Sequence, residues 1–122
     1  MFGKKILLLF SLFVLVAMAQ SDKFVGGPEP LTGDDLKEAE ELLATSLAEI
    51  AGGDVPRYII VKVIRATRQV VAGTLYNINA ELSDNQNNTK SCIVKIWTRP
   101  WIPNSTEVTL QCEDENEITK TY

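Results

Sequence analysis

The sequence predicts an α+β fold in which one α-helix is wrapped by a four-to-five-stranded antiparallel β-sheet. One stretch, between residues 32 and 51, places apolar residues at the spacing of a single helix face. Later segments are rich in β-branched residues or alternate apolar with polar ones, and hairpin-length connections separate them. Strands joined in this way pair antiparallel, and the apolar face of their sheet needs a helix to cover it.

The N-terminus is typical of a secretory signal peptide rather than of the fold. Lysines at positions 4 and 5 precede the apolar run Ile6–Ala17, and residues 17–19, Ala-Met-Ala, offer small side chains at a cleavage site. A membrane anchor is the alternative, but this run is too short to cross about 30 Å of hydrocarbon comfortably. We therefore expect residues 1–19 to be removed and residues 20–122 to be secreted as one extracellular domain.

An extended arm and a helix begin the mature chain. The arm, Gln20–Pro30, contains glycines and prolines that a helix or a central strand would not tolerate. Thr32, with Asp35 three residues later, resembles a capping box, and Gly52-Gly53 ends the helix. The face expected to pack on the sheet is formed by Leu36, Ala39, Leu43, Leu47 and Ile50.

The strands are expected after the helix. Their ranges are Tyr58–Arg68, Thr74–Leu82, Cys92–Arg99 and Thr106–Cys112. Alternation places the following apolar residues on shared faces: Tyr76, Ile78, Ala80, Leu82, Cys92, Val94, Ile96, Val108, Leu110 and Cys112. The segment Asp84–Lys90 is a polar loop, and the polar residues from Glu113 onward are expected to fray.

The composition excludes several classes of function. With no histidine and two cysteines, the chain cannot build a Ser-His-Asp triad, a Cys-His dyad, a His-liganded zinc site or a Cys₄ metal site. Carboxylates such as Glu81 and Asp84 are better explained as a solvated face, so we expect no enzyme, cofactor or metal. The net charge of −4 argues against nucleic acid or an anionic membrane as partner. In an oxidising compartment, Cys92 and Cys112 should form one disulfide, with two free thiols as the alternative.

Three apolar segments lie where polar residues are the rule. The first connection, Gln69–Gly73, contains two valines, and one continuous strand with a bulge at Gly73 is the alternative. The connection Arg99–Ser105 contains two prolines and exposes Trp101, unless the tryptophan folds back on the core. The third segment is Phe24-Val25, and the alternative is that this pair belongs to an ordinary disordered N-terminus. Together they would form an exposed apolar ridge of the kind that marks a partner site.

These segments resemble the motifs of secreted cystatins, which inhibit papain-like cysteine proteases. Gly26 is similar to the N-terminal glycine of the family, Gln69–Gly73 matches its Gln-x-Val-x-Gly first hairpin loop, and Pro100-Trp101 matches its second loop. The cysteines before and after the Pro-Trp pair are spaced as in the C-terminal disulfide of the family. The resemblance covers residues 20–122, and it is strongest to the small secreted insect cystatins.

The resemblance implies a reversible, non-covalent wedge that enters the cleft of papain or of cathepsin L- or B-like proteases. The arm would occupy non-primed subsites, the first loop would enter the cleft, and Trp101 would pack on the primed side. The expected contact residues are Phe24, Val25, Gly26, Gln69, Val70, Val71, Ala72, Gly73, Pro100 and Trp101. A monomer is expected, and the alternative function is a non-inhibitory extracellular binding module on the same fold.

The chain also departs from the pattern of some cystatins. The stretch Gly52–Pro56 lacks the asparagine with which some members inhibit legumain, so we expect no legumain inhibition. Two N-glycosylation sequons begin at Asn87 and Asn104. Asn87 lies in the polar loop and is a plausible acceptor. Asn104 is three residues from Trp101, so we expect it to be unmodified or to carry a glycan that points away.

Overall fold

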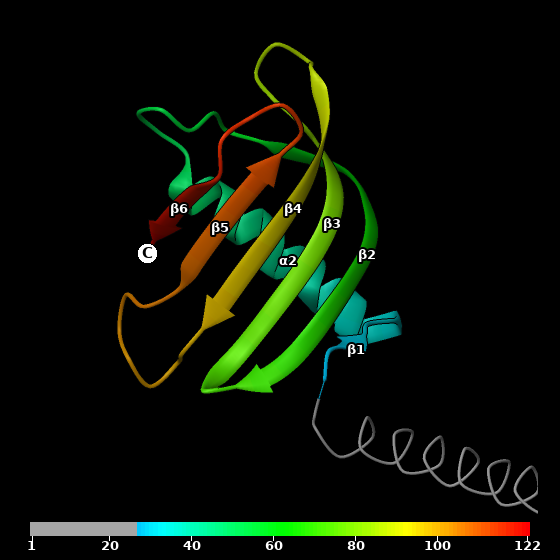
Figure 1. The fold of residues 1–122 in the computed structure, drawn as a ribbon, viewed down its shortest axis with the longest axis vertical. Helices are drawn as coiled ribbons and strands as arrows, with labels where there is room; N and C mark the ends of the chain where they lie inside the picture. The colour runs from blue at the N-terminus through cyan, green and yellow to red at the C-terminus, as the bar shows by residue number, and fades with distance from the viewer. Residues whose placement is uncertain (1–26) are drawn as a thin grey trace, which may run out of the picture.

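The computed structural model describes residues 27–122, so the predicted signal peptide and the arm residues Phe24, Val25 and Gly26 lie outside the described residues. Within this range, one long helix packs on a six-stranded antiparallel sheet whose strands follow one another in chain order (Figure 1). The elements are β1 (Glu29–Pro30), α2 (Gly33–Ile50), β2 (Ile59–Val71), β3 (Gly73–Ser83), β4 (Thr89–Thr98), β5 (Glu107–Cys112) and β6 (Ile118–Thr121). The predicted α+β class is confirmed.

The helix α2 presents the predicted face to the sheet. The residues of that face are buried, apart from Leu36, which lies half-buried against the same core. The predicted capping box is wrong, because the side chain of Thr32, the N-cap residue, makes no capping hydrogen bond with any residue in 27–122. Asp35 instead forms an ion pair with the guanidinium of Arg68 on β2, at 3.6 Å. The helix ends at Ile50, directly before Ala51 and the two predicted stop glycines.

The sheet has more strands than expected, because both ends of the described chain join it. At one edge, Glu29-Pro30 pairs with Thr67 and Arg68 of β2. An edge strand tolerates proline, because one side of the strand needs no ladder hydrogen bond. At the other edge, β6 pairs with β5. The expectation that the residues from Glu113 onward fray is therefore wrong for this strand.

The C-terminal residue explains why this end of the chain stays in place. The backbone of Tyr122 exchanges two hydrogen bonds of 2.9 Å with Thr106, which continues the ladder past β6. Its hydroxyl forms a hydrogen bond of 2.8 Å with Oγ of Ser46, a fully buried residue of the helix. The composition of the last residues does not predict this anchor, since the partly buried tyrosine depends on a partner 76 positions earlier.

The core lies between the helix and the inward face of the sheet. The alternate apolar residues predicted for β3, β4 and β5 are all buried. In β2 the alternation is interrupted, because register shifts occur between Ile60 and Lys62 and between Val63 and Arg65. Bulges of this kind bend a strand and redirect side chains, which leaves Val61 and Ile64 about half exposed.

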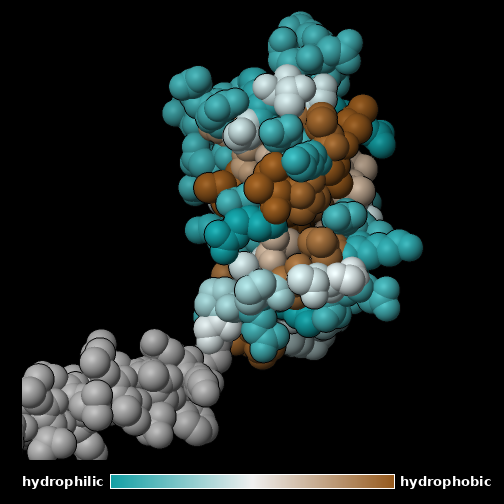
Figure 2. All heavy atoms as spheres, turned by 90° about the vertical axis from the view of Figure 1, so that its right-hand side faces the viewer, coloured by the Kyte–Doolittle hydropathy of each residue, from teal (hydrophilic) through white to brown (hydrophobic). Residues whose placement is uncertain are grey.

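Apolar side chains also gather on the β2 side of the molecule, which faces the viewer in Figure 2. Exposed apolar residues of β2 include Ile59, Val61 and Ile64. Ile93 of β4 lines the same shallow hollow as Ile64. The β-branched run predicted a strand, which is confirmed, and the structure adds that several of its side chains are exposed to solvent.

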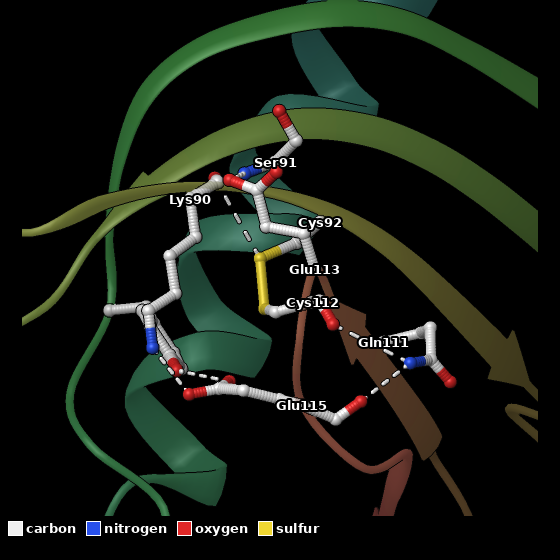
Figure 3. The surroundings of a disulfide bond; sticks show 8 residues. Lys90, Ser91, Cys92, Gln111, Cys112, Glu113 and Glu115 are labelled. Carbon is white, nitrogen blue, oxygen red and sulfur yellow. Dashed lines mark hydrogen bonds and ion pairs between the residues drawn. A yellow bond between two sulfur atoms is a disulfide. The ribbon is translucent and has the colours of Figure 1, made fainter.

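The predicted disulfide joins Cys92 of β4 to Cys112 of β5, which face each other across the ladder with their Cα atoms 4.0 Å apart (Figure 3). Around it, Glu115 forms an ion pair with Lys90 and accepts a hydrogen bond from the hydroxyl of Tyr58 at 3.3 Å. Burial, and then the negative charge of Glu115, raise the pKa of the Tyr58 hydroxyl. This cluster ties the segment after β5 to the end of the sheet that bears the disulfide.

Candidate functional site

The first predicted tip is a tight hairpin. The strand β2 continues to Val71, β3 begins at Gly73, and Ala72 is the single residue between them. Val71 and Gly73 face each other across the ladder, so the chain reverses here and the alternative of one continuous strand is wrong. Val70 is 80% exposed and Val71 is 41% exposed, so the apex presents β-branched side chains to solvent. We name the segment Gln69–Gly73 the first tip.

The second predicted tip is the connection between β4 and β5. Its fold is local, because the amide of Ile102 donates to the carbonyl of Arg99 at 3.0 Å. Oγ of the buried Ser105 lies 2.9 and 2.6 Å from the carbonyl oxygens of Arg99 and Ile102, which share its single donated proton. Trp101 is 62% exposed, so the alternative in which it folds back on the core is wrong. We name the segment Arg99–Ser105 the second tip.

The two tips lie at the same end of the molecule and are in contact at their bases (Figure 1). Gly73 has a φ of +99°, and a Cβ built on it would lie 2.2 Å from the carbonyl oxygen of Thr98, directly before the second tip. The indole Nε1–H of Trp97 donates to the carbonyl oxygen of Ala72 at 2.8 Å. The sequence therefore predicted both tips, and the structure adds that they are packed together.

Trp97 contacts both tips, although none of the sequence motifs includes it. It lies in β4 and carries the guanidinium of Arg99 over its ring, with 4.0 Å from the guanidinium carbon to the ring centre. The sequence does contain a signal for it. The buried residues Val94 and Ile96 stand at even positions of this strand, whereas Trp97 stands at an odd position and therefore on the outward face. A large aromatic residue on the outward face of a strand needs a partner for its N–H, and here that partner is the first tip.

The arm enters the fold at the same end. Its attachment point is β1, which pairs with Thr67 and Arg68 just before the first tip. The neighbouring Tyr76 hydroxyl, and then the negative charge of Asp35, raise the pKa of the Arg68 guanidinium. Phe24, Val25 and Gly26 lie outside the described residues, so the structure locates only β1, which follows them in the chain.

The described residues offer little for other chemistry. Within 27–122, no three His, Cys, Asp or Glu side chains are grouped so that they could hold a metal ion. No helix in the same range is both long enough and apolar enough to cross a membrane. What the tips present is exposed apolar surface on tightly turned backbone.

A family model described as the cystatin domain matches residues 26–114, which include both tips. The chain belongs to the cystatin family. Cystatins are protease inhibitors and not enzymes. This agrees with the absence of histidine from the sequence, which excludes catalytic sites built on that residue.

Two insect relatives extend the match over nearly all of this cystatin. Sarcocystatin-A of Sarcophaga peregrina is 45% identical over 107 residues, which cover 88% of this chain and 87% of the relative. A cystatin-like protein of Drosophila melanogaster is 41% identical over 111 residues, which cover 89% of this chain and 87% of the relative. The resemblance to insect cystatins is therefore confirmed.

A solved structure supports the fold. The crystal structure of a salivary cystatin from the soft tick Ornithodoros moubata aligns with a TM-score of 0.56 at 21% identity. The alignment covers 72% of this cystatin and 97% of the tick chain. At this identity the likeness concerns the fold alone.

Proposed function

We propose that this cystatin is secreted and that it inhibits papain-like cysteine proteases, such as papain and cathepsin L- or B-like enzymes, reversibly and without covalent chemistry. The observation that carries the proposal is the pair of apolar tips at one end of the molecule, in contact with each other. Exposed apolar side chains on rigid hairpins bury surface on binding while they lose little conformational entropy.

The proposed complex uses three segments as a wedge. Val70, Val71 and Ala72 of the first tip enter the active-site cleft, with Gln69 and Gly73 at the base of this tip. Pro100 and Trp101 of the second tip pack on the primed side. Phe24 and Val25 occupy non-primed subsites, and Gly26 lets the backbone pass the catalytic centre without presenting a cleavable bond.

Titration of papain and of a cathepsin L-like protease with the secreted protein tests this function. Trp101→Ala should weaken inhibition by roughly 1–4 kcal/mol, as expected for an exposed aromatic anchor. The fold should keep its stability, because Trp101 contributes no buried core surface. Ile93→Ala is the matched control, since it removes a partly exposed apolar side chain from β4 far along the strand from the tips.

The second candidate is a non-inhibitory extracellular binding module. The exposed apolar hollow lined by Ile64 and Ile93 is the observation that favours it, because it lies away from both tips. The same titration discriminates between the two. Absence of inhibition at micromolar concentrations of secreted protein would reject the inhibitor and favour the module.

Mass spectrometry of the secreted protein tests the processing that the proposal requires. We expect the N-terminus at Gln20 and a glycan at Asn87, which lies exposed in the loop between β3 and β4, at the end opposite the tips (Figure 1). Asn104 lies in the second tip, so we expect no glycan there that obstructs Trp101. Full glycan occupancy at Asn104 together with tight inhibition would contradict the obstruction argument.

A further inference from the structure

Trp97 connects the first tip to the strand that leads into the second. Its indole N–H donates to the carbonyl oxygen of Ala72, the single residue between β2 and β3. Trp97 and Ala72 are 25 positions apart in the chain, so the hydrogen bond is a tertiary contact and not part of the local turn. A side chain of β4 thus holds the apex of the neighbouring hairpin by its backbone.

Arg99 continues the connection from the indole ring into the second tip. The guanidinium lies over the ring of Trp97 at 4.0 Å, a cation–π distance. One guanidinium nitrogen, Nη2, also donates to the carbonyl oxygen of Ser105 at 3.4 Å. The hydroxyl of Ser105 donates back to the carbonyl of Arg99. The chain of contacts therefore runs from the apex of the first tip, through Trp97, to the far side of the second.

The base of the first tip meets the backbone directly before the second tip without spare room. A Cβ on Gly73 would meet the carbonyl oxygen of Thr98, and its next neighbour would be Cγ of Arg99 at 3.0 Å. Trp97, Val71 and Leu75 line one shallow hollow on the outer face, beside this contact. Two contacts therefore join the base of the first tip to β4, the close approach at Gly73 and the hydrogen bond from Trp97 to Ala72.

We propose that Trp97 is a positioning residue that fixes the orientation of the first tip relative to the second. The consequence for inhibition rests on the function proposed above. Two tips that enter one cleft must fit it at the same time. If only a fraction of molecules holds the right arrangement, the apparent dissociation constant rises by the inverse of that fraction. Trp97 acts through Ala72 and Arg99, and it contributes without touching the protease.

Trp97→Phe tests the role of the N–H with little change elsewhere, since phenylalanine keeps an aromatic ring on β4 and under Arg99. Loss of one hydrogen bond of ordinary strength should raise amide hydrogen exchange by about fivefold in the ladder pairs that close the first tip, Gln69 with Leu75 and Val70 with Thr74. Inhibition of papain should weaken by a similar factor of about five. Exchange across the disulfide-linked pair Cys92 and Cys112 should stay as in the unchanged protein.

A double-mutant cycle with Trp101→Ala separates positioning from general destabilisation. Once the second tip has lost its anchor, the orientation of the first tip relative to it matters less. The penalty of Trp97→Phe should therefore shrink in the Trp101→Ala background. If Trp97→Phe only destabilised the fold, its penalty on inhibition would be the same in both backgrounds. Ile93→Ala, on the same strand, should change neither tip exchange nor inhibition.

The outcomes distinguish this inference from the proposed function. Unchanged exchange in the two ladder pairs that close the first tip in Trp97→Phe, or fully additive penalties, would overturn the positioning role. If the unchanged protein fails to inhibit any papain-like protease, the proposed function is wrong. In that case the exchange measurement still decides whether Trp97 holds the first tip.

Discussion

At the scale of single residues, the space around the backbone decides which side chains the tips can carry. Gly73 has a backbone conformation that side chains rarely adopt, and the carbonyl oxygen of Thr98 fills the place of its missing Cβ. Gly27, by contrast, has nothing within 4 Å of an added Cβ. The two glycines look alike in the sequence, and only one of them is required by a close approach of two chain segments.

Gly73→Ala should therefore damage both stability and inhibition. The backbone strain alone should lower the free energy of unfolding by about 1–3 kcal/mol, and the tip must move away from Thr98. Thermal denaturation measures the first effect and papain titration the second. For thermal stability, Gly27→Ala is the matched control and should leave the midpoint unchanged. A Gly73→Ala protein with unaltered stability would contradict the close approach.

At the scale of elements, the loop between β3 and β4 shows how a connection without a disulfide is ordered. One carboxylate oxygen of Asp84 accepts hydrogen bonds from the amides of Gln86 and Asn88, at 2.9 and 3.0 Å. The backbone of Asn87, at a φ of 61°, donates to the carbonyl of Asp84. A single aspartate thus organises the segment that the sequence marked only as polar.

Acid should loosen this loop. The amides of Asn88, and then of Gln86, lower the pKa of Asp84, so the folded loop favours the charged carboxylate. Its stabilising contribution is present above the ordinary aspartate pKa of about 3.9 and is lost as the pH falls through the lowered pKa. NMR of the Gln86 and Asn88 amides from about pH 6 to about pH 2 should show this transition.

Asp84→Asn is the matched variant for the acid titration. The asparagine side chain keeps an oxygen acceptor but does not ionise, so the loop should form at both ends of the pH range. The titration step in the amide signals should disappear. A step of equal size in this variant would mean that another group loosens the loop.

At the scale of the whole molecule, binding and covalent stabilisation lie at opposite ends. The tips occupy the end where β2 and β4 finish, whereas Cys92 lies near the start of β4 and Cys112 at the end of β5 (Figure 1). The disulfide closes the connection that contains the second tip, with a sequence separation of 20. The disulfide should therefore stabilise the fold mainly by restricting the unfolded chain, with little effect on the geometry of the tips.

Replacement of both cysteines by serine tests this separation. The loop-entropy estimate for such a ring is about 3 kcal/mol of stability. For a domain of this size, that corresponds to a fall of about 10–20 °C in the thermal midpoint. Papain titration well below the new midpoint should give nearly unchanged inhibition. A large loss of inhibition in a folded double variant would show that the disulfide also shapes the second tip.

Local patterns predicted most of the fold. The inward residues of β3, β4 and β5 follow from strict alternation, and the buried helix face follows from the spacing of Leu43 and Leu47 with their neighbours. The strands β1 and β6 were missed, because edge strands are short and their pairing depends on a neighbour rather than on their own composition. The capping box failed for a related reason, since Asp35 has a distant ion-pair partner in Arg68.

By itself, the sequence determined the class of the fold, the pairing of its two cysteines and the positions of the two apolar tips. These depend on periodicity, residue type and chain order, which are local properties. Only the tertiary structure decided that the tips touch, that Gly73 has no room for a side chain, and that Trp97 holds Ala72. Those contacts join residues about 25 positions apart, and their geometry follows from how the strands pair and bend.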